Sequence, residues 1–259
     1  MDLALTREVS PALARCELTH LARAPIDLAR AREQHRRYEA VLESLGCTLV
    51  RLPAEPELPD SVFVEDVAIV TDELAILTRP GAASRRPEVA TVALALAPYR
   101  QLLAIEAPAT LDGGDVLRVG RTVYVGQSRR TNADGLTQLR SILEPRGYRV
   151  VAVPVTGCLH LKSAVTQVAQ DTVLLHPGWV EPATFAAHER IEIDPAEPHA
   201  ANGLLARGTL VYPVAYPRTR ERLEARGIPI AEVDVSELAK AEGAVTCCSV
   251  VFQAPAHFV

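Results

Sequence analysis

The chain has 259 residues, of which 48% are hydrophobic and 23% are charged, and its formal net charge at pH 7 is −5. This composition is typical of a soluble globular protein and excludes a disordered, collagen-like or mucin-like chain. The charge is mildly negative and no Lys/Arg stripe is present. Nucleic acid and anionic lipid are therefore disfavoured as partners, and a cationic small molecule is favoured.

Three further features bear on the cellular location. No apolar run approaches the ~20 residues that cross a bilayer, and the N-terminus carries Asp2 and Glu8 where a secretory signal has a basic region. The five cysteines are an odd number and fit neither a disulfide framework nor a zinc ribbon. We therefore expect a cytoplasmic protein with free thiols.

An amphipathic helix that ends at a glycine and runs directly into a short β-branched strand recurs along the chain. Glycine commonly ends helices because it adopts the left-handed conformation without steric cost. Three copies are clear and two, starting at residues 85 and 181, are weaker. The predicted helix and strand ranges are 25–45 with 47–52, 85–97 with 101–105, 131–146 with 148–153, 181–188 with 190–193, and 217–226 with 228–234.

Sequences typical of β-hairpins lie between these pairs, so each unit is predicted to be strand, strand, helix, strand. A unit repeated about five times indicates a radial or solenoid architecture, and the alternative is an open α/β sheet. A last strand at 246–252 has no helix after it, and we expect it to pair with a strand at 4–9 and close a ring. The predicted hairpins are 61–70 with 75–78, 116–119 with 122–125, and 204–205 with 209–212.

Cys247 and Cys248 are adjacent in this predicted last strand, so their side chains should point to opposite faces. Ring closure would place Cys247 near a strand end that faces the centre. A free cysteine is more often a buried, unreactive thiol. The assignment of a nucleophile therefore depends on partner residues.

His160 is the best candidate partner, because its short loop also holds a lysine and a glycine. Asp112 precedes Gly113 and Gly114, where a sharp bend would let its side chain project from closely packed backbone; a simple Asx-turn is the alternative. A cysteine, a histidine and an aspartate together are typical of nucleophilic sites. These residues predict covalent catalysis.

Glu65 and Asp66 interrupt a predicted apolar strand, where burial costs several kcal/mol unless a cation or donors meet them. If they converge with Asp60 on Cys247 and His160, the site suits a guanidinium, whose planar fork matches carboxylates. Metal binding is the competing use of such groups. Since no His-x-x-x-His or His-Glu-x-x-His spacing is present, we expect neither a metal nor a cofactor, apart from adventitious zinc on Cys247.

Two arginine segments complete the inventory. Residues 84–86 follow a Pro-Gly turn, and residues 129–132 open a predicted helix, where arginine is unusual. An arginine in that place often binds an anion such as a substrate carboxylate.

Six motifs, in order and over nearly the whole chain, resemble those of dimethylarginine dimethylaminohydrolase. The resemblance implies the α/β, five-bladed ββαβ propeller of the pentein, or guanidino-group-modifying, superfamily. That fold has pseudo-fivefold symmetry and a central active site, here in a single domain over residues 1–259. The motifs are residues 60–66 (DSVFVED), 78–81 with 84–86, 111–117 (LDGGDVL), 130–132, 159–163 (LHLKS) and 246–249 (TCCS).

By this resemblance Cys247 attacks the guanidinium carbon of a methylated arginine and expels dimethylamine or methylamine. Water then hydrolyses the covalent intermediate to citrulline. His160 would protonate the departing amine and then activate the water, with Asp112 orienting it. The positive substrate should favour the Cys247 thiolate.

The resemblance also implies roles around the substrate. Asp66 would hold the guanidinium, Arg85 and Arg130 would grip the amino-acid carboxylate, and Leu18 matches a mobile flap residue. Position 112 is Asp where some members carry Glu. The substrate-binding residues implied are Leu18, Asp60, Phe63, Glu65, Asp66, Arg85, Arg130 and Ala241.

Three alternatives stay open or are disfavoured. Arginine deiminases use a similar residue set but are longer, with a helical insertion, and amidinotransferases are longer too. Pentein-fold translation factors bind without chemistry and need no such site. The preferred N-substituent is left open, and the protein is expected to be a monomer or a homodimer.

Overall fold

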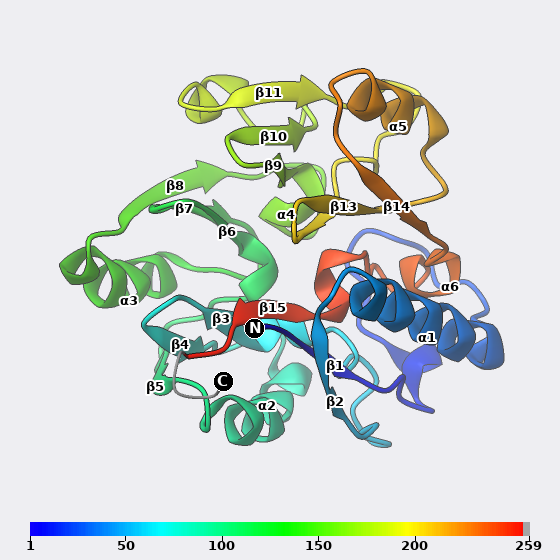
Figure 1. Ribbon diagram of the computed structural model, residues 1–259. Coiled ribbons are helices and arrows are strands. Elements are labelled where there is room, and N and C mark those ends of the chain that lie inside the picture. Colours follow the sequence, from blue (N-terminus) through cyan, green and yellow to red (C-terminus); the bar gives the residue numbers. More distant parts are fainter. Residues whose placement is uncertain (256–259) are drawn as a thin grey trace.

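The computed structural model describes residues 1–255, in which the strands form five sheets of three strands each around a central axis (Figure 1). In one sheet, β6 (Val116–Val119) pairs antiparallel with β7 (Thr122–Gln127), and β7 pairs parallel with β8 (Arg149–Pro154). Helix α3 (Ala133–Leu143) connects β7 to β8 and packs on the sheet. This ββαβ unit is one blade of the predicted propeller.

Three further blades repeat this order, which confirms the predicted unit. In one of these blades the predicted helix at 181–188 is only a short 3₁₀ turn. The antiparallel strand pair of that blade was also not predicted from the sequence. These blades are β3 (Ala68–Val70), β4 (Leu74–Leu77), η3 (Ala83–Glu88) with α2 (Val89–Leu96), and β5 (Gln101–Ala104); β9 (Val165–Ala169), β10 (Thr172–Leu175), η6 (Pro182–Phe185) and β11 (Glu189–Glu192); β12 (Leu204–Ala206), β13 (Thr209–Pro213), α5 (Pro217–Glu224) and β14 (Ile230–Val233).

The fifth blade joins the two ends of the described chain. Strand β1 (Asp2–Arg7) pairs antiparallel with β15 (Val250–Gln253) and parallel with β2 (Thr48–Leu52), and Asp2 lies opposite Gln253. Figure 1 shows the first and last strands side by side, with the larger helices toward the outside of the ring. The predicted ring closure is confirmed.

Helix α1 (Leu28–Ser44) covers this fifth blade. It begins later than predicted, because the Asp27 side chain accepts a hydrogen bond from the Arg30 amide and so caps the first turn. Gly46 follows the helix with φ +90°, a backbone conformation that glycine adopts without strain. The glycine that ended the predicted helix therefore has the expected role.

Short helical turns precede four of the inner strands and meet near the axis. Turn η2 (Val64–Val67) contacts η4 (Gly113–Asp115) and η7 (Thr246–Cys248), and α4 (Leu161–Ala164) contacts η4. Two of these turns were predicted as strand: β3 begins only at Ala68 and β15 only at Val250. The error arises because a run of buried apolar residues does not distinguish a strand from a short helical turn.

Other parts of the fold are small. The remaining short elements are η1 (Leu13–Arg15), η5 (Glu144–Arg146) and α6 (Ser236–Ala239). Within residues 1–255 the helices fall short of the length and apolarity that a membrane crossing needs.

Tyr38 on α1 ties the outer helix to the turn that carries Cys247. Its fully buried hydroxyl lies 2.9 Å from the Val245 carbonyl oxygen and 2.7 Å from the Ser249 hydroxyl. Tyr38→Phe leaves these groups unpaired, and we expect the free energy of unfolding to fall by about 1–3 kcal/mol. Urea denaturation measures this.

The control is Tyr216→Phe, because Tyr216 is half-buried and its hydroxyl has no hydrogen-bond partner among residues 1–255. An equal loss of stability in the two variants would contradict the role given to the Tyr38 hydroxyl.

Candidate active site

A small cavity lies where the inner turns meet, and most of the predicted site residues line it. Its walls include three segments that carry sequence motifs: turn η2, the residue just before α4, and turn η7. The lining residues are Glu17, Asp60, Phe63, Asp66, Arg85, Arg130, Leu159, His160, Ala241, Glu242, Gly243 and Cys247.

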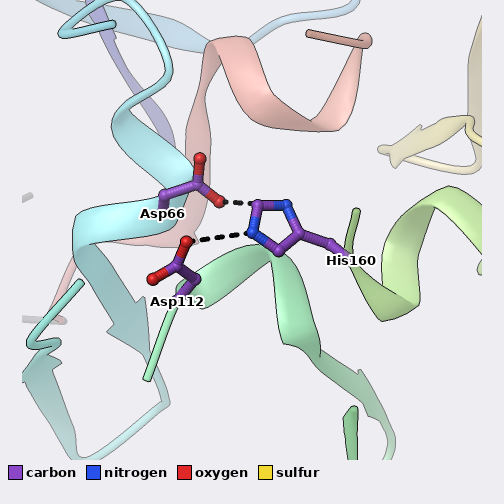
Figure 2. Close-up of side chains that lie close together, drawn as sticks. All are labelled: Asp66, Asp112 and His160. Atoms are coloured by element: carbon purple, nitrogen blue, oxygen red, sulfur yellow. Dashed lines mark hydrogen bonds and ion pairs between the residues drawn. The ribbon is translucent and has the colours of Figure 1, made fainter. Parts of the chain in front are cut away.

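His160 lies between two carboxylates, as Figure 2 shows. Its Nε2 atom is 3.0 Å from an Asp112 carboxylate oxygen, and its Nδ1 atom is 3.7 Å from an Asp66 oxygen. Asp112 directly precedes η4, Asp66 lies on η2, and His160 precedes α4. Three blades thus bring one imidazole and two carboxylates together.

Burial alone would lower the pKa of His160, but the charges of Asp66, Asp115 and Asp112 and the hydrogen bond to Asp112 outweigh it and raise the pKa to about 9. Burial likewise opposes ionisation of Asp66, yet His160 and Arg85 hold its pKa at about 2. At neutral pH the site therefore contains an imidazolium between carboxylates, which can donate a proton.

Gly114 and Asp115 support this arrangement from behind. A Cβ atom on Gly114 would lie 2.6 Å from His160 Nδ1 and 2.7 Å from an Asp66 oxygen, so only glycine fits. Asp115 accepts a hydrogen bond from the Leu161 amide at 3.0 Å and fixes the start of α4. The Gly-Gly-Asp sequence thus has the close packing that the motif predicted.

Cys247 and Cys248 face different surroundings, although they lie on a 3₁₀ turn and not on the predicted strand. Cys247 lines the cavity, whereas Cys248 is fully buried in the core beneath α1. Burial, together with the negative charges of Asp66 and Glu65, raises the pKa of Cys247 to about 12. Without a cationic ligand the thiol is therefore protonated.

Arg85 is mainly an internal counter-ion. Its guanidinium lies 2.5 Å from an Asp66 oxygen and binds both oxygens of Glu88, and it donates to the backbone carbonyls of Asp60 and Phe63. The sequence resemblance implied a carboxylate-binding role for Arg85. The structure places it in the cavity wall, but with most of its N–H donors already engaged.

Arg130 has fewer partners within the protein. One of its terminal nitrogens donates to the Thr19 hydroxyl at 3.1 Å, and the other lies 3.9 Å from an Asp112 oxygen. This cation lines the cavity and is 9% exposed. It is the arginine best able to receive an additional anion.

Glu65 and Leu18 lie outside the cavity. The Glu65 carboxylate accepts a hydrogen bond from Lys162 at 2.6 Å and lines a separate cavity of about 230 Å³. Leu18 packs against the core beside Phe63, next to Glu17, which does line the site. The predicted direct contact of Glu65 with substrate is therefore not supported by the direction of its side chain.

Three lining residues were not singled out from the sequence: Glu17, Glu242 and Gly243. Each lies within two residues of a predicted site residue, Leu18 or Ala241, and this proximity was the available signal. Glu88, which accepts two hydrogen bonds from Arg85, gave none.

Asp66, Asp112 and His160 each offer an atom within 4.8 Å of the others, as a metal site requires. A histidine ligand must be neutral, whereas this imidazole is held protonated, and Arg85 already occupies one Asp66 oxygen. The chemistry of these residues suits proton transfer better than metal binding.

A ring of five ββαβ blades around a cysteine, a histidine and aspartates defines the pentein class. Residues 54–202 match the family model described as arginine deiminase. The chain is 43% identical to N(G),N(G)-dimethylarginine dimethylaminohydrolase from Streptomyces coelicolor, over 95% of each chain, and 38% identical to the Pseudomonas aeruginosa protein of that name, over 87% of this chain and 90% of that one.

The comparison of structures agrees. A cysteine-to-serine variant of the P. aeruginosa protein, complexed with citrulline, superposes with a TM-score of 0.90 at 35% identity, over 96% of this chain and 98% of the other. This chain therefore belongs to the dimethylarginine dimethylaminohydrolase family.

The contact with Asp112 makes a testable contribution to the charge of His160. Asp112→Asn removes a facing negative charge, so we expect the pKa of His160 to fall by about 1–3 pH units from about 9. NMR titration of the imidazole measures this, and Asp134→Asn, at an exposed position of α3, is the control.

The same change alters the pH dependence of stability. Because folding raises the pKa of His160, its stabilisation is complete below its usual pKa of about 6.5 and is lost as pH rises through about 9. Asp112→Asn should flatten that decline. An unchanged pKa and an unchanged decline would show that Asp112 does not hold the proton.

Proposed function

We propose that the protein hydrolyses N-omega-methylated arginines to citrulline and dimethylamine or methylamine. The observation that carries the proposal is that His160 lies 3.7 Å from an Asp66 oxygen and lines the same cavity as Cys247. This set supplies a proton donor, an anion for a guanidinium and a nucleophile. Two of the relatives named above are N(G),N(G)-dimethylarginine dimethylaminohydrolases, and the variant of one of them is complexed with citrulline, the product expected here.

Asp66 would bind the substrate guanidinium. Its carboxylate stays ionised despite burial, and Arg85 holds it in place. At the other end of the cavity Arg130 would bind the amino-acid carboxylate, with Asp60 close to the ammonium group. Asp60, Phe63 and Ala241 also line the cavity and would limit its shape.

Cys247 would lose its proton to solvent as the substrate binds and would form a bond to the guanidinium carbon as the thiolate. The C–N bond to the methylated nitrogen then breaks, and the proton on His160 passes to the departing amine. Neutral His160 next takes a proton from water, which attacks the same carbon. The C–S bond breaks to give citrulline and the thiolate, which is protonated from solvent once citrulline leaves.

Formation of the thiolate would depend on the substrate. Burial and the charges of Asp66 and Glu65 hold the Cys247 pKa at about 12 in the free protein. A guanidinium bound against Asp66 offsets that repulsion and favours the charged thiolate. The nucleophile is thereby protected from reaction until substrate is present.

A second candidate is hydrolysis of arginine itself with release of ammonia. The match of residues 54–202 to the arginine deiminase model supports it, since the same groups serve either leaving amine. One or two methyl groups change the transition-state energy by only ~1–3 kcal/mol. The two activities must therefore be separated by experiment.

The protein should be incubated with asymmetric dimethylarginine, monomethylarginine and arginine, and the ureido product and released amine measured. We expect citrulline with dimethylamine or methylamine from the first two, at a kcat/KM at least about tenfold above that for arginine. Preferred release of ammonia from arginine would move the assignment to a deiminase.

Cys247→Ser should lower kcat by roughly four orders of magnitude or more, because the hydroxyl is a much weaker nucleophile at this site. Cys248→Ser is the matched control, since Cys248 lies in the core and should affect stability more than turnover. Equal losses of kcat in the two variants would reject Cys247 as the nucleophile.

A further inference from the structure

Glu242 makes an unusual set of contacts beside the cavity. Its carboxylate accepts hydrogen bonds from three consecutive backbone amides, those of Thr19, His20 and Leu21, at 2.5–3.0 Å. These amides belong to residues 17–21, here called the flap. A single charged side chain on the C-terminal segment therefore holds a loop from the other end of the sequence.

The backbone at Glu242 also points to a side-chain role. Its φ is +57°, in the left-handed region that non-glycine residues rarely adopt. Glycine would relieve this conformation, and the next residue, Gly243, cannot carry a side chain because a Cβ atom would lie 2.2 Å from the Phe63 ring. The glutamate is thus present at a position where the backbone favours glycine.

The flap forms part of the wall of the catalytic cavity. Glu17 lines the cavity, its amide donates to Asp60 at 3.1 Å, and Thr19 accepts a hydrogen bond from Arg130. The remaining free space is about 20 Å³, room for one water molecule. An arginine derivative can enter only if part of this lining moves.

We propose that Glu242 is a positioning residue that latches the flap over the cavity. Breaking its bonds to the three amides opens the cavity, and remaking them encloses the bound substrate with Cys247 and His160. The effect of Glu242 on turnover rests on the proposed function, because only the closed complex shields the substrate, Cys247 and His160 from bulk water. Its effect on the flap and on access to Cys247 does not.

Two variants test the latch. Glu242→Gln keeps the size but loses the charge and one acceptor oxygen, and Glu242→Gly removes the side chain and suits the backbone. We expect amide hydrogen exchange at residues 19–21 to rise about tenfold or more, since charge-assisted bonds are lost. Alkylation of Cys247 by iodoacetamide should rise similarly, with the buried Cys47 and Cys248 unchanged.

Arg207→Gly is the matched control, because Arg207 is the other non-glycine residue with positive φ in the described chain, at +48°, and does not line the cavity. It should leave exchange at residues 19–21 and labelling of Cys247 unchanged. Unchanged exchange and labelling in both Glu242 variants would overturn the latch. Increased labelling of all five cysteines would do the same, since it would show general loosening.

Turnover gives a separate result. In the Glu242 variants kcat for asymmetric dimethylarginine should fall at least about threefold while Cys247 becomes more accessible, and Arg207→Gly should retain wild-type kcat. An unchanged kcat in a variant with faster flap exchange would overturn the catalytic part of the proposal. Wild-type protein without activity on methylated arginines would reject the proposed function, but the exchange and labelling results would still test the latch.

Discussion

The balance of buried charge around the axis constrains the rest of the structure. Asp66 and Asp112 face His160, and Asp66 and Glu88 face Arg85, all within the interior. A buried charge without a partner costs several kcal/mol, so each group depends on the others being in place. The protonated imidazole and the ionised Asp66 are consequences of this balance, and the chemistry of the cavity follows from them.

The ring of blades makes that balance attainable. Four functional residues lie on, or just before, a short turn ahead of an inner strand, at η2, η4, α4 and η7: Asp66, Asp112, His160 and Cys247. Because the blades share one topology, equivalent positions converge on the axis although they are far apart in sequence. Behind them, packed sheets and outer helices hold the turns in place, so the fold provides a rigid scaffold for a small number of polar side chains.

The sequence predicted the features that depend on local pattern. Helix–glycine–strand units identified the blades, and Cys247, His160 and Asp112 were recognisable from their motifs. Buried runs such as 61–70 were assigned as strand because apolar composition does not reveal a 3₁₀ turn. The engagement of Arg85 by Glu88, the bond of the buried Glu65 to Lys162 and the contacts of Glu242 depend on tertiary geometry, for which the sequence has no periodic signal.

The pairing of β1 with β15 has a consequence for the order of assembly. In the other blades the paired strands are neighbours along the chain, whereas this pairing brings Asp2 opposite Gln253. Closing so long a loop costs more entropy than forming a local hairpin, so it favours a late step in folding. Cys247 is carried by the turn just before β15, and the thiol therefore joins its carboxylates and imidazole only as the ring closes.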